Sequence, residues 1–195
     1  MTTFNFTAEM ERLIGDISAR MDEFAHIDPS RILVCVSSTR SGGVHGVQAK
    51  IHPLRFSGGA MTREVRRGRR RYLCTMPAIN HQGREILYLI YFLSPRFFNL
   101  PLREKLITII HELYHISPSF DGDIRRFAGR NFAHGSSTRK YNALMANLAD
   151  RYRELLGDTP LPEFLNHDLD DLRNNHRAVV AHKLTAPRIK ISPLP

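Results

Sequence analysis

Two histidines and a glutamate stand together as His111, Glu112 and His115 within an apolar stretch of the chain. Because an α-helix turns once in about 3.6 residues, His111 and His115 can offer two imidazoles to one point. Glu112 lies about 100° further round the helix, where its carboxylate can reach a metal-bound water without being a ligand. Zinc lowers the pKa of such a water toward about 7, and a neighbouring carboxylate takes the proton as the water attacks a carbonyl. The spacing predicts a hydrolytic Zn²⁺ site with Glu112 as general base.

The residues around this motif predict that its helix is buried. Pro101 suits the first turn of a helix, and Pro118 is expected to stop it. The apolar residues between them are spaced to form one packing face: Leu102, Leu106, Ile109, Ile110 and Leu113. Unpaired histidine and glutamate side chains are costly in a core, and a metal ion is the simplest partner that compensates for them.

A catalytic zinc ion usually has three protein ligands and keeps one position for water. The favoured third ligand is His134, which is followed by Gly135 and ends a glycine-containing loop at residues 117–135. Imidazole is the commonest ligand for this metal, and a loop of that length can fold back over the motif helix. The carboxylates that compete with His134 are Asp121, Asp123 and, on a later helix, Asp150 or Glu154.

Other side chains near the motif have a simpler interpretation. Tyr114 is expected to pack in the helix rather than to donate a hydrogen bond to a reacting oxygen. Three loop arginines could hold a substrate carboxylate or simply face solvent, and the sequence does not separate these options: Arg125, Arg126 and Arg130.

The elements that must position these side chains follow from periodicity. An amphipathic helix is expected to begin with Thr7 as N-cap and to end near Asp28, and another is expected over residues 137–156. Strands are expected at residues 31–37, 44–56, 71–76 and 85–93, with Pro53 marking the second as an edge or bent strand. The sequence therefore predicts an α+β fold: an N-terminal helix, a small three- to four-stranded and mostly antiparallel sheet, the motif helix, and a further C-terminal helix.

Positive charge is concentrated in two segments of this 195-residue chain of net charge +9. Residues 61–72 hold six arginines against Glu64 alone, and residues 173–195 hold five cations and no acid. Such runs contact polyanions or form solvated loops and tails. The arginine run is expected to be a connection between strands. Five of its members are candidate nucleic-acid-binding residues: Arg66, Arg67, Arg69, Arg70 and Arg71.

After Gly157 the composition shifts to prolines, asparagines and histidines with little periodicity, although a short helix is expected near residues 161–172. This predicts a domain at residues 1–157 and a basic, proline-containing tail at 158–195. The two cysteines, Cys35 and Cys74, lie in separate strand-like runs and are expected to be buried thiols. With no secretory signal or membrane span visible, we expect a cytoplasmic protein.

The sequence resembles the SprT-like zinc metallopeptidases, especially the compact branch described as phage or archaeal metallopeptidases. Three stretches carry the resemblance: the run from His111 to Ile116, the run from Pro118 to Gly122, and His134-Gly135 leading into a helix. The resemblance covers roughly residues 30–156. It implies a zincin-like fold in which His111, His115 and His134 bind zinc and Glu112 is the base. Relatives of this type often carry a cysteine zinc ribbon after the protease domain, whereas residues 158–195 contain no cysteine.

Three functions follow as hypotheses. The first is a zinc-dependent endopeptidase, whose extended substrate would pair with the strand before the motif helix. The second is a nucleic-acid-associated protein with a structural or vestigial metal site, which would contact DNA through the arginine run and the basic tail. The third is an interaction module whose tail docks to a partner in a larger assembly.

Overall fold

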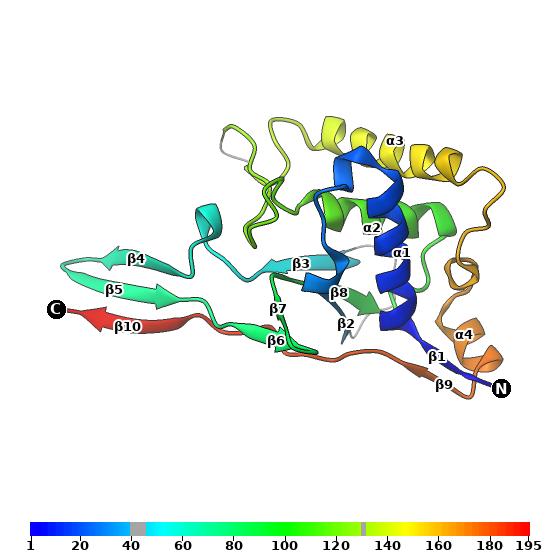
Figure 1. Cartoon of the computed structure of the whole chain (residues 1–195), viewed down its shortest axis with the longest axis horizontal. Coiled ribbons are helices and arrows are strands. Elements are labelled where there is room, and N and C mark those ends of the chain that lie inside the picture. Colours follow the sequence, from blue (N-terminus) through cyan, green and yellow to red (C-terminus); the bar gives the residue numbers. More distant parts are fainter. Residues whose placement is uncertain (40–45, 130–131) are drawn as a thin grey trace.

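A three-stranded sheet lies at the centre of the body, with helices on one face, and a second three-stranded sheet extends from the body as an arm (Figure 1). The computed structural model describes residues 1–39, 46–129 and 132–195. The helices are α1 (Phe6–Arg20), α2 (Leu102–Tyr114), α3 (Thr138–Leu156) and α4 (Leu169–Asn175), with short 3-10 turns at Asp22–Phe24, Pro29–Arg31, Ser57–Gly59 and Glu163–Asn166. The strands are β1 (Thr3–Asn5), β2 (Ile32–Ser38), β3 (Ala49–Pro53), β4 (Thr62–Arg67), β5 (Arg70–Thr75), β6 (Ile79–His81), β7 (Arg84–Ile86), β8 (Tyr88–Ser94), β9 (Ala178–Val180) and β10 (Lys190–Leu194). The predicted α+β class is confirmed.

The central sheet has the order β2-β8-β3, with β8 parallel to β2 and antiparallel to β3. The long segment between β2 and β8 is what allows the parallel pairing, which a short hairpin could not make. Because β8 is paired on both edges and covered on both faces, Tyr88 through Phe92 are all buried, which accounts for their unbroken apolar run. The sheet is therefore mixed, whereas the sequence predicted mostly antiparallel pairing. The predicted edge strand is confirmed at β3; residues 44 and 45 of that prediction lie outside the described residues.

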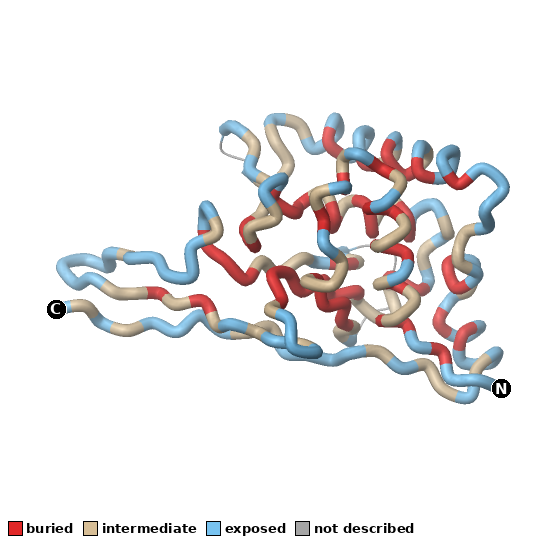
Figure 2. The backbone as a smooth tube through the Cα atoms, viewed as in Figure 1, coloured by how far each residue is buried: buried red, intermediate tan, exposed pale blue. Residues whose placement is uncertain are grey.

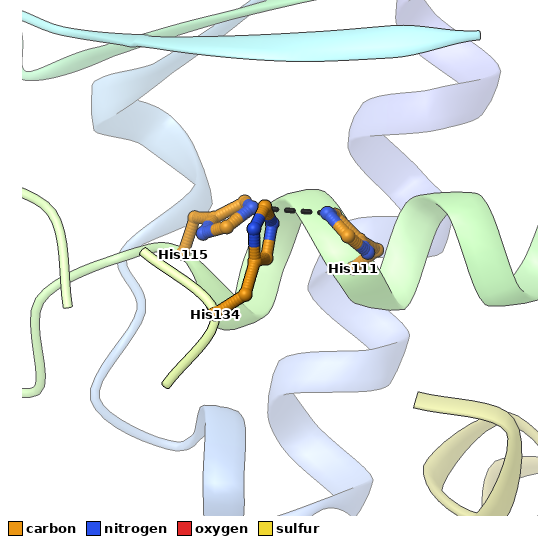
Figure 3. Close-up of side chains that lie close together, drawn as sticks. All are labelled: His111, His115 and His134. Atoms are coloured by element: carbon orange, nitrogen blue, oxygen red, sulfur yellow. Dashed lines mark hydrogen bonds between the residues drawn. The ribbon is translucent and has the colours of Figure 1, made fainter. Parts of the chain in front are cut away.

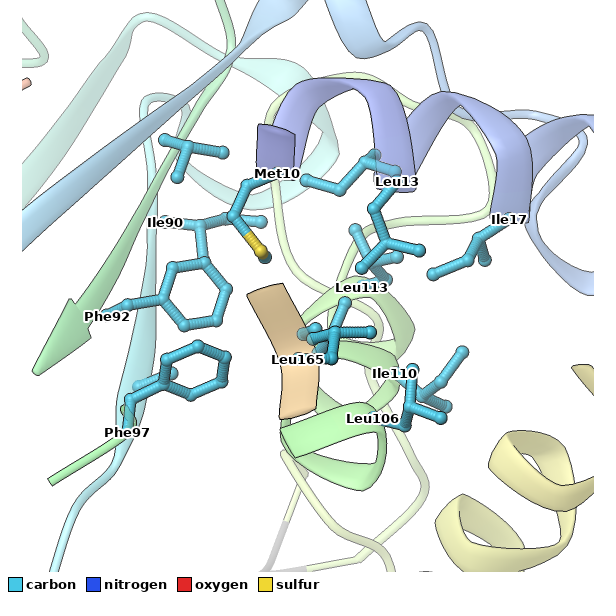
Figure 4. Packing of buried hydrophobic residues seen from close by; sticks show 14 of the residues in the cluster. Met10, Leu13, Ile17, Ile90, Phe92, Phe97, Leu106, Ile110, Leu113 and Leu165 are labelled. Atoms are coloured by element: carbon cyan, nitrogen blue, oxygen red, sulfur yellow. The ribbon is translucent and has the colours of Figure 1, made fainter. Parts of the chain in front are cut away.

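Alternation along these strands builds a core on each face of the sheet. On one face, Val34, Ile90 and Phe92 pack against α1 and α2 (Figure 4). On the other, Leu33, Leu89 and Tyr91 pack against residues before and within the arm. Both cysteines belong to this second cluster and are free and buried, as the sequence predicted.

The first helix differs from its prediction at both ends. Asn5, not Thr7, is its N-cap, and the Asn5 side chain accepts a hydrogen bond from the Ala8 N–H. Thr7 instead faces the core, where its hydroxyl donates to the Val34 carbonyl. The helix ends at Arg20 because Met21 takes an extended conformation and keeps its side chain in the core.

The arginine run is a β-hairpin, so the prediction of a connection was wrong. Strands β4 and β5 pair antiparallel around a turn at Gly68 and Arg69, and Gly68 has a φ of 61°, which glycine adopts without strain. The sequence pattern did not reveal this hairpin because arginines occupy both of its faces. Only three less polar residues mark one face: Val65, Tyr72 and Cys74. Strand β10 then pairs with β5 and completes the arm.

Residues after Gly157 contribute to the same core as the rest of the body. Leu165 and Leu172 are fully buried there, and the Lys105 ammonium on α2 donates to the carbonyls of Leu165 and His167 at 3.1 and 2.6 Å. The short helix expected near 161–172 is present in two pieces, a 3-10 turn and α4. Strand β9 pairs with β1, so that the segment crosses the molecule before it reaches the arm (Figure 1). Whether residues 158–195 can be separated from residues 1–157 stays a prediction.

Among the described residues, none of the helices has both the length and the apolar character that a bilayer span requires.

The burial of Leu165 predicts that the C-terminal segment stabilises the body. Leu165→Ala should lower the free energy of unfolding by about 2–5 kcal/mol, since it leaves a cavity beneath α2. Leu184→Ala is the matched control in the same segment, because that side chain is 39% exposed, and its effect should stay below about 0.5 kcal/mol. Urea unfolding measures the free energy of unfolding of both variants. If both substitutions had equal, small effects on it, the C-terminal segment would not stabilise the body.

Candidate metal centre

Helix α2 places His111, Glu112 and His115 at its C-terminal end. The helix is fixed by its apolar face, of which Leu106, Ile110 and Leu113 are fully buried. His115 is the C-cap residue, still in helical conformation at φ −70° and ψ −16°, so the four-residue spacing brings it over His111. The two Nε2 atoms lie 3.0 Å apart (Figure 3).

His134 comes to these two rings from the loop that follows α2. Its ring centroid lies 5.3 Å from that of His111 and 5.0 Å from that of His115 (Figure 3). The next residue, Gly135, has a φ of 72°, a left-handed conformation that glycine adopts without strain, and it lies near the Phe127 ring. The Nε2 atom of His134 is buried and has no hydrogen-bond partner among the described residues.

The three imidazoles fit a bound metal ion. One nitrogen from each ring lies within 4.8 Å of the others, and no other described group of three or more such side chains meets that condition. Two nitrogens held about 2.0–2.1 Å from one tetrahedral ion are about 3.4 Å apart, close to the observed 3.0 Å. A buried ring nitrogen without a partner is rare, and an ion would supply one. The role of these histidines as ligands stays a prediction.

Burial keeps the α2 imidazoles in the neutral form that a metal ligand requires. It lowers the pKa of His111 to about 4, with His134 as a second cause. It lowers the pKa of His115 to about 3, helped by His111, His134 and Arg125.

Glu112 is buried beside the histidines, with 6% of its surface exposed. Burial raises the pKa of Glu112 to about 7, while a hydrogen bond with the Ile51 backbone acts in the opposite direction. The carboxylate thus sits between the motif helix and strand β3, next to the three imidazoles but outside their cluster.

Three of the four carboxylates that competed with His134 for the third position have partners of their own, and the fourth, Glu154, is not part of the histidine cluster. Asp123 forms an ion pair with Arg126 and accepts from the Gly58 N–H. Asp121 accepts from the Asp123 N–H and closes a turn. Asp150 pairs with Arg103 at 2.7 Å, which joins α3 to the first turn of α2.

Tyr141 is the residue of this centre that the sequence analysis missed. It lies in the first turn of α3, and its ring centroid is 5.2, 5.9 and 4.8 Å from those of His111, His115 and His134. Its hydroxyl is buried and makes no hydrogen bond among the described residues. In sequence it is simply one member of an amphipathic helix face, so no local signal distinguished it.

Of the loop arginines, Arg125 holds the loop rather than facing solvent. Its guanidinium lies 4.2 Å above the Tyr114 ring and donates to the Tyr114 carbonyl, while its backbone N–H donates to His115. Tyr114 is thus a packing residue, as expected. Arg130 lies outside the described residues, and the five candidate nucleic-acid-binding arginines lie on the arm.

The cluster predicts that metal binding depends on all three histidines. Purified protein should contain about one zinc per chain, and His134→Ala should bind less than a tenth of that, since two imidazoles alone hold the ion poorly. His167→Ala, in the C-terminal segment, is the control and should keep full occupancy. Elemental analysis after dialysis measures both; full zinc content in the His134 variant would contradict the assignment.

Comparison with known proteins agrees with this geometry. Residues 4–143, most of the chain, match the family model described as "Putative phage metallopeptidase". The matched segment contains all three histidines, Glu112 and Tyr141. No curated protein and no solved structure matches the chain. The extent of the family match and the histidine cluster lead to one conclusion: the chain belongs to this phage metallopeptidase family.

Proposed function

We propose that the protein is a zinc-dependent endopeptidase in which His111, His115 and His134 hold the ion and Glu112 is the general base. The observation that supports it is the convergence of three imidazoles within 4.8 Å beside a buried carboxylate. Zinc in such a site polarises a peptide carbonyl and lowers the pKa of a water molecule. The family match supports a peptidase in general terms, and the choice of zinc rests on the three imidazole donors.

A catalytic site fits better than a structural one. Structural zinc sites are closed by four protein ligands, whereas catalytic sites keep one position for water or substrate. Within the described residues the cluster contains three histidines and no fourth histidine, cysteine, aspartate or glutamate. This favours the peptidase over the hypothesis of a structural metal site.

Glu112 is placed to move the proton. It takes the proton from the attacking water and returns it to the amine that leaves when the peptide bond breaks. The Ile51 N–H orients its carboxylate, and burial keeps bulk water away from it.

The open edge of β3 is the place for an extended substrate. The strand before the motif helix is β8, which is paired on both sides and cannot accept another strand, so that part of the sequence hypothesis was wrong. The Leu93 N–H donates to the Gln48 carbonyl and the Leu54 N–H donates to the Leu87 carbonyl, so Ala49, Ile51 and Pro53 direct their backbone groups away from β8. The Ile51 N–H meets Glu112 there, and the backbone of Ala49 faces the open edge. A peptide pairing along this edge would lie beside Glu112.

Tyr141 is suited to stabilise the reacting carbonyl oxygen. Its hydroxyl is an unused donor in a buried site among the three imidazoles, and a preorganised donor of this kind acts most strongly where water is excluded.

The SprT-like subtype remains part of this proposal. The histidine motif, the Pro118 to Gly122 run and His134-Gly135 support it, and the lack of cysteine in residues 158–195 separates this chain from relatives with a zinc ribbon.

Replacing Glu112 tests the mechanism. Glu112→Gln should lower kcat/KM for a fluorescent casein substrate by about 10²–10⁴-fold while zinc content stays at one per chain, since the variant loses only the proton acceptor. Glu104→Gln, in the exposed first turn of the same helix, is the matched control and should be as active as the wild type. Undiminished cleavage by Glu112→Gln would exclude the proposal.

Replacing Tyr141 tests the second donor. Tyr141→Phe should lower kcat by about 10²-fold, with KM, zinc content and Tm little changed, because it removes one donor to the reacting oxygen. Tyr152→Phe is the matched control on the same helix: its hydroxyl donates to Asp16 at 2.7 Å, so its loss should cost about 1 kcal/mol of stability and leave kcat unchanged. If both variants lost only stability, Tyr141 would be a packing residue.

A further inference from the structure

The arm, composed of β4, β5 and β10, places Lys190 of the second basic segment alongside the arginine run of the first. The segments are more than a hundred residues apart in sequence, yet β10 pairs along β5 from Lys190↔Thr75 to Leu194↔Arg71. Figure 1 shows the three strands extending away from the helices, and Figure 2 shows that their outer part is largely exposed. Six arginines and Lys190 lie on this arm against one acid, Glu64.

The strand register sets like charges directly opposite one another. Arg66 faces Arg71 and Arg67 faces Arg70, on either side of the turn that carries Arg69. Like charges at directly opposed positions destabilise a strand pair. Arg71 offsets part of this cost, since it lies 4.0 Å from Glu64 and donates to the Pro195 carbonyl, whereas its three neighbours have no acid within ion-pair distance among the described residues. A surface that meets an anion would keep such cations.

Both faces of the arm are cationic. Because side chains alternate, Arg66, Arg71 and Lys190 lie on one face and Arg67 and Arg70 on the other. Arg67 lies 6.0 Å from the centre of the Tyr72 ring and Arg63 5.1 Å from that of Phe56. Stacking of this kind holds a guanidinium in place while its N–H groups stay available to an acceptor.

The cations of the arm are arginines rather than lysines, which argues that they do more than keep the arm soluble. Exposed sheet edges are protected mainly by lysine, whereas all six cations of residues 61–72 are arginine. Arginine presents a planar fork of donors that matches two oxygens of a phosphate group.

We infer that the arm binds the phosphate backbone of double-stranded nucleic acid. A narrow ribbon with cations on both faces and at its tip matches a duplex groove, whose two walls both carry phosphates. A flat anionic membrane would meet only one face. This surface is independent of the histidine cluster, which lies in the body.

The experiment measures binding of a fluorescently labelled 20-base-pair DNA duplex to the full chain by anisotropy, from 50 to 200 mM salt. Binding should weaken steeply with salt, because each neutralised phosphate releases counterions. The double variants Arg66→Gln/Arg71→Gln and Arg67→Gln/Arg70→Gln should each bind about tenfold more weakly and reduce the log–log salt slope by about 2. Arg67→Gln/Arg70→Gln should not lower Tm, since it removes an opposed pair of like charges. Arg66→Gln/Arg71→Gln also removes exposed contacts of Arg71 with Glu64 and Pro195, so its Tm should change little.

The matched control is Arg12→Gln/Arg173→Gln, which removes the same charge from exposed positions on the body and should bind DNA like the wild type. Glu112→Gln should also bind normally, so that loss of peptidase activity and loss of binding are told apart. No binding at 50 mM salt, equal loss in the control, or tighter binding to phosphatidylserine vesicles than to the duplex would each overturn the inference.

Discussion

Three imidazoles, of which His115 is buried and the other two half-buried, converge at the C-terminal end of α2, where the Glu112 carboxylate is buried, and the rest of the body serves to keep them there. Burial favours the neutral form of His111 and His115, and the His134 Nε2 has no hydrogen-bond partner within the part of the chain that the structure describes. Polar groups in this condition are costly unless something compensates for them. A metal ion held by the three imidazoles would do so.

The packing around α2 explains how so polar a cluster is held in a small protein. One side of the helix lies in the core with α1 and the central sheet, and α3 covers it from outside with Tyr141 over the imidazoles. The C-terminal segment closes the remaining side, where Leu165 is buried and the Lys105 ammonium, its pKa lowered to about 8 by burial, reaches two carbonyls of that segment. The helix is thus immobilised on several sides, which is what a preorganised site requires.

The two faces of the central sheet pack against different parts of the protein. One face builds the core that carries the histidines, while the other packs against the strands that lead into the arm. The sheet therefore joins the half-buried histidine cluster to an exposed cationic ribbon. Peptide-bond hydrolysis and contact with a polyanion can accordingly be considered as two properties of one chain.

The sequence by itself determined the features that depend on local geometry. The spacing of His111, Glu112 and His115 on a helix, the apolar run of β8 and the helix over residues 137–156 all follow from periodicity within one element. Tertiary structure decided what depends on pairing between distant segments. His134 and Asp121 were both plausible third ligands from the sequence. The folded loop places His134 at the cluster, whereas the Asp121 carboxylate accepts a hydrogen bond from the Asp123 N–H. Tyr141 looked like ordinary packing, the arginines looked like a connection, and Lys190 had no reason to lie near them. The periodicity of one segment specifies which of its faces is buried, but not which distant segment covers that face, because that choice depends on the packing energy of the whole chain.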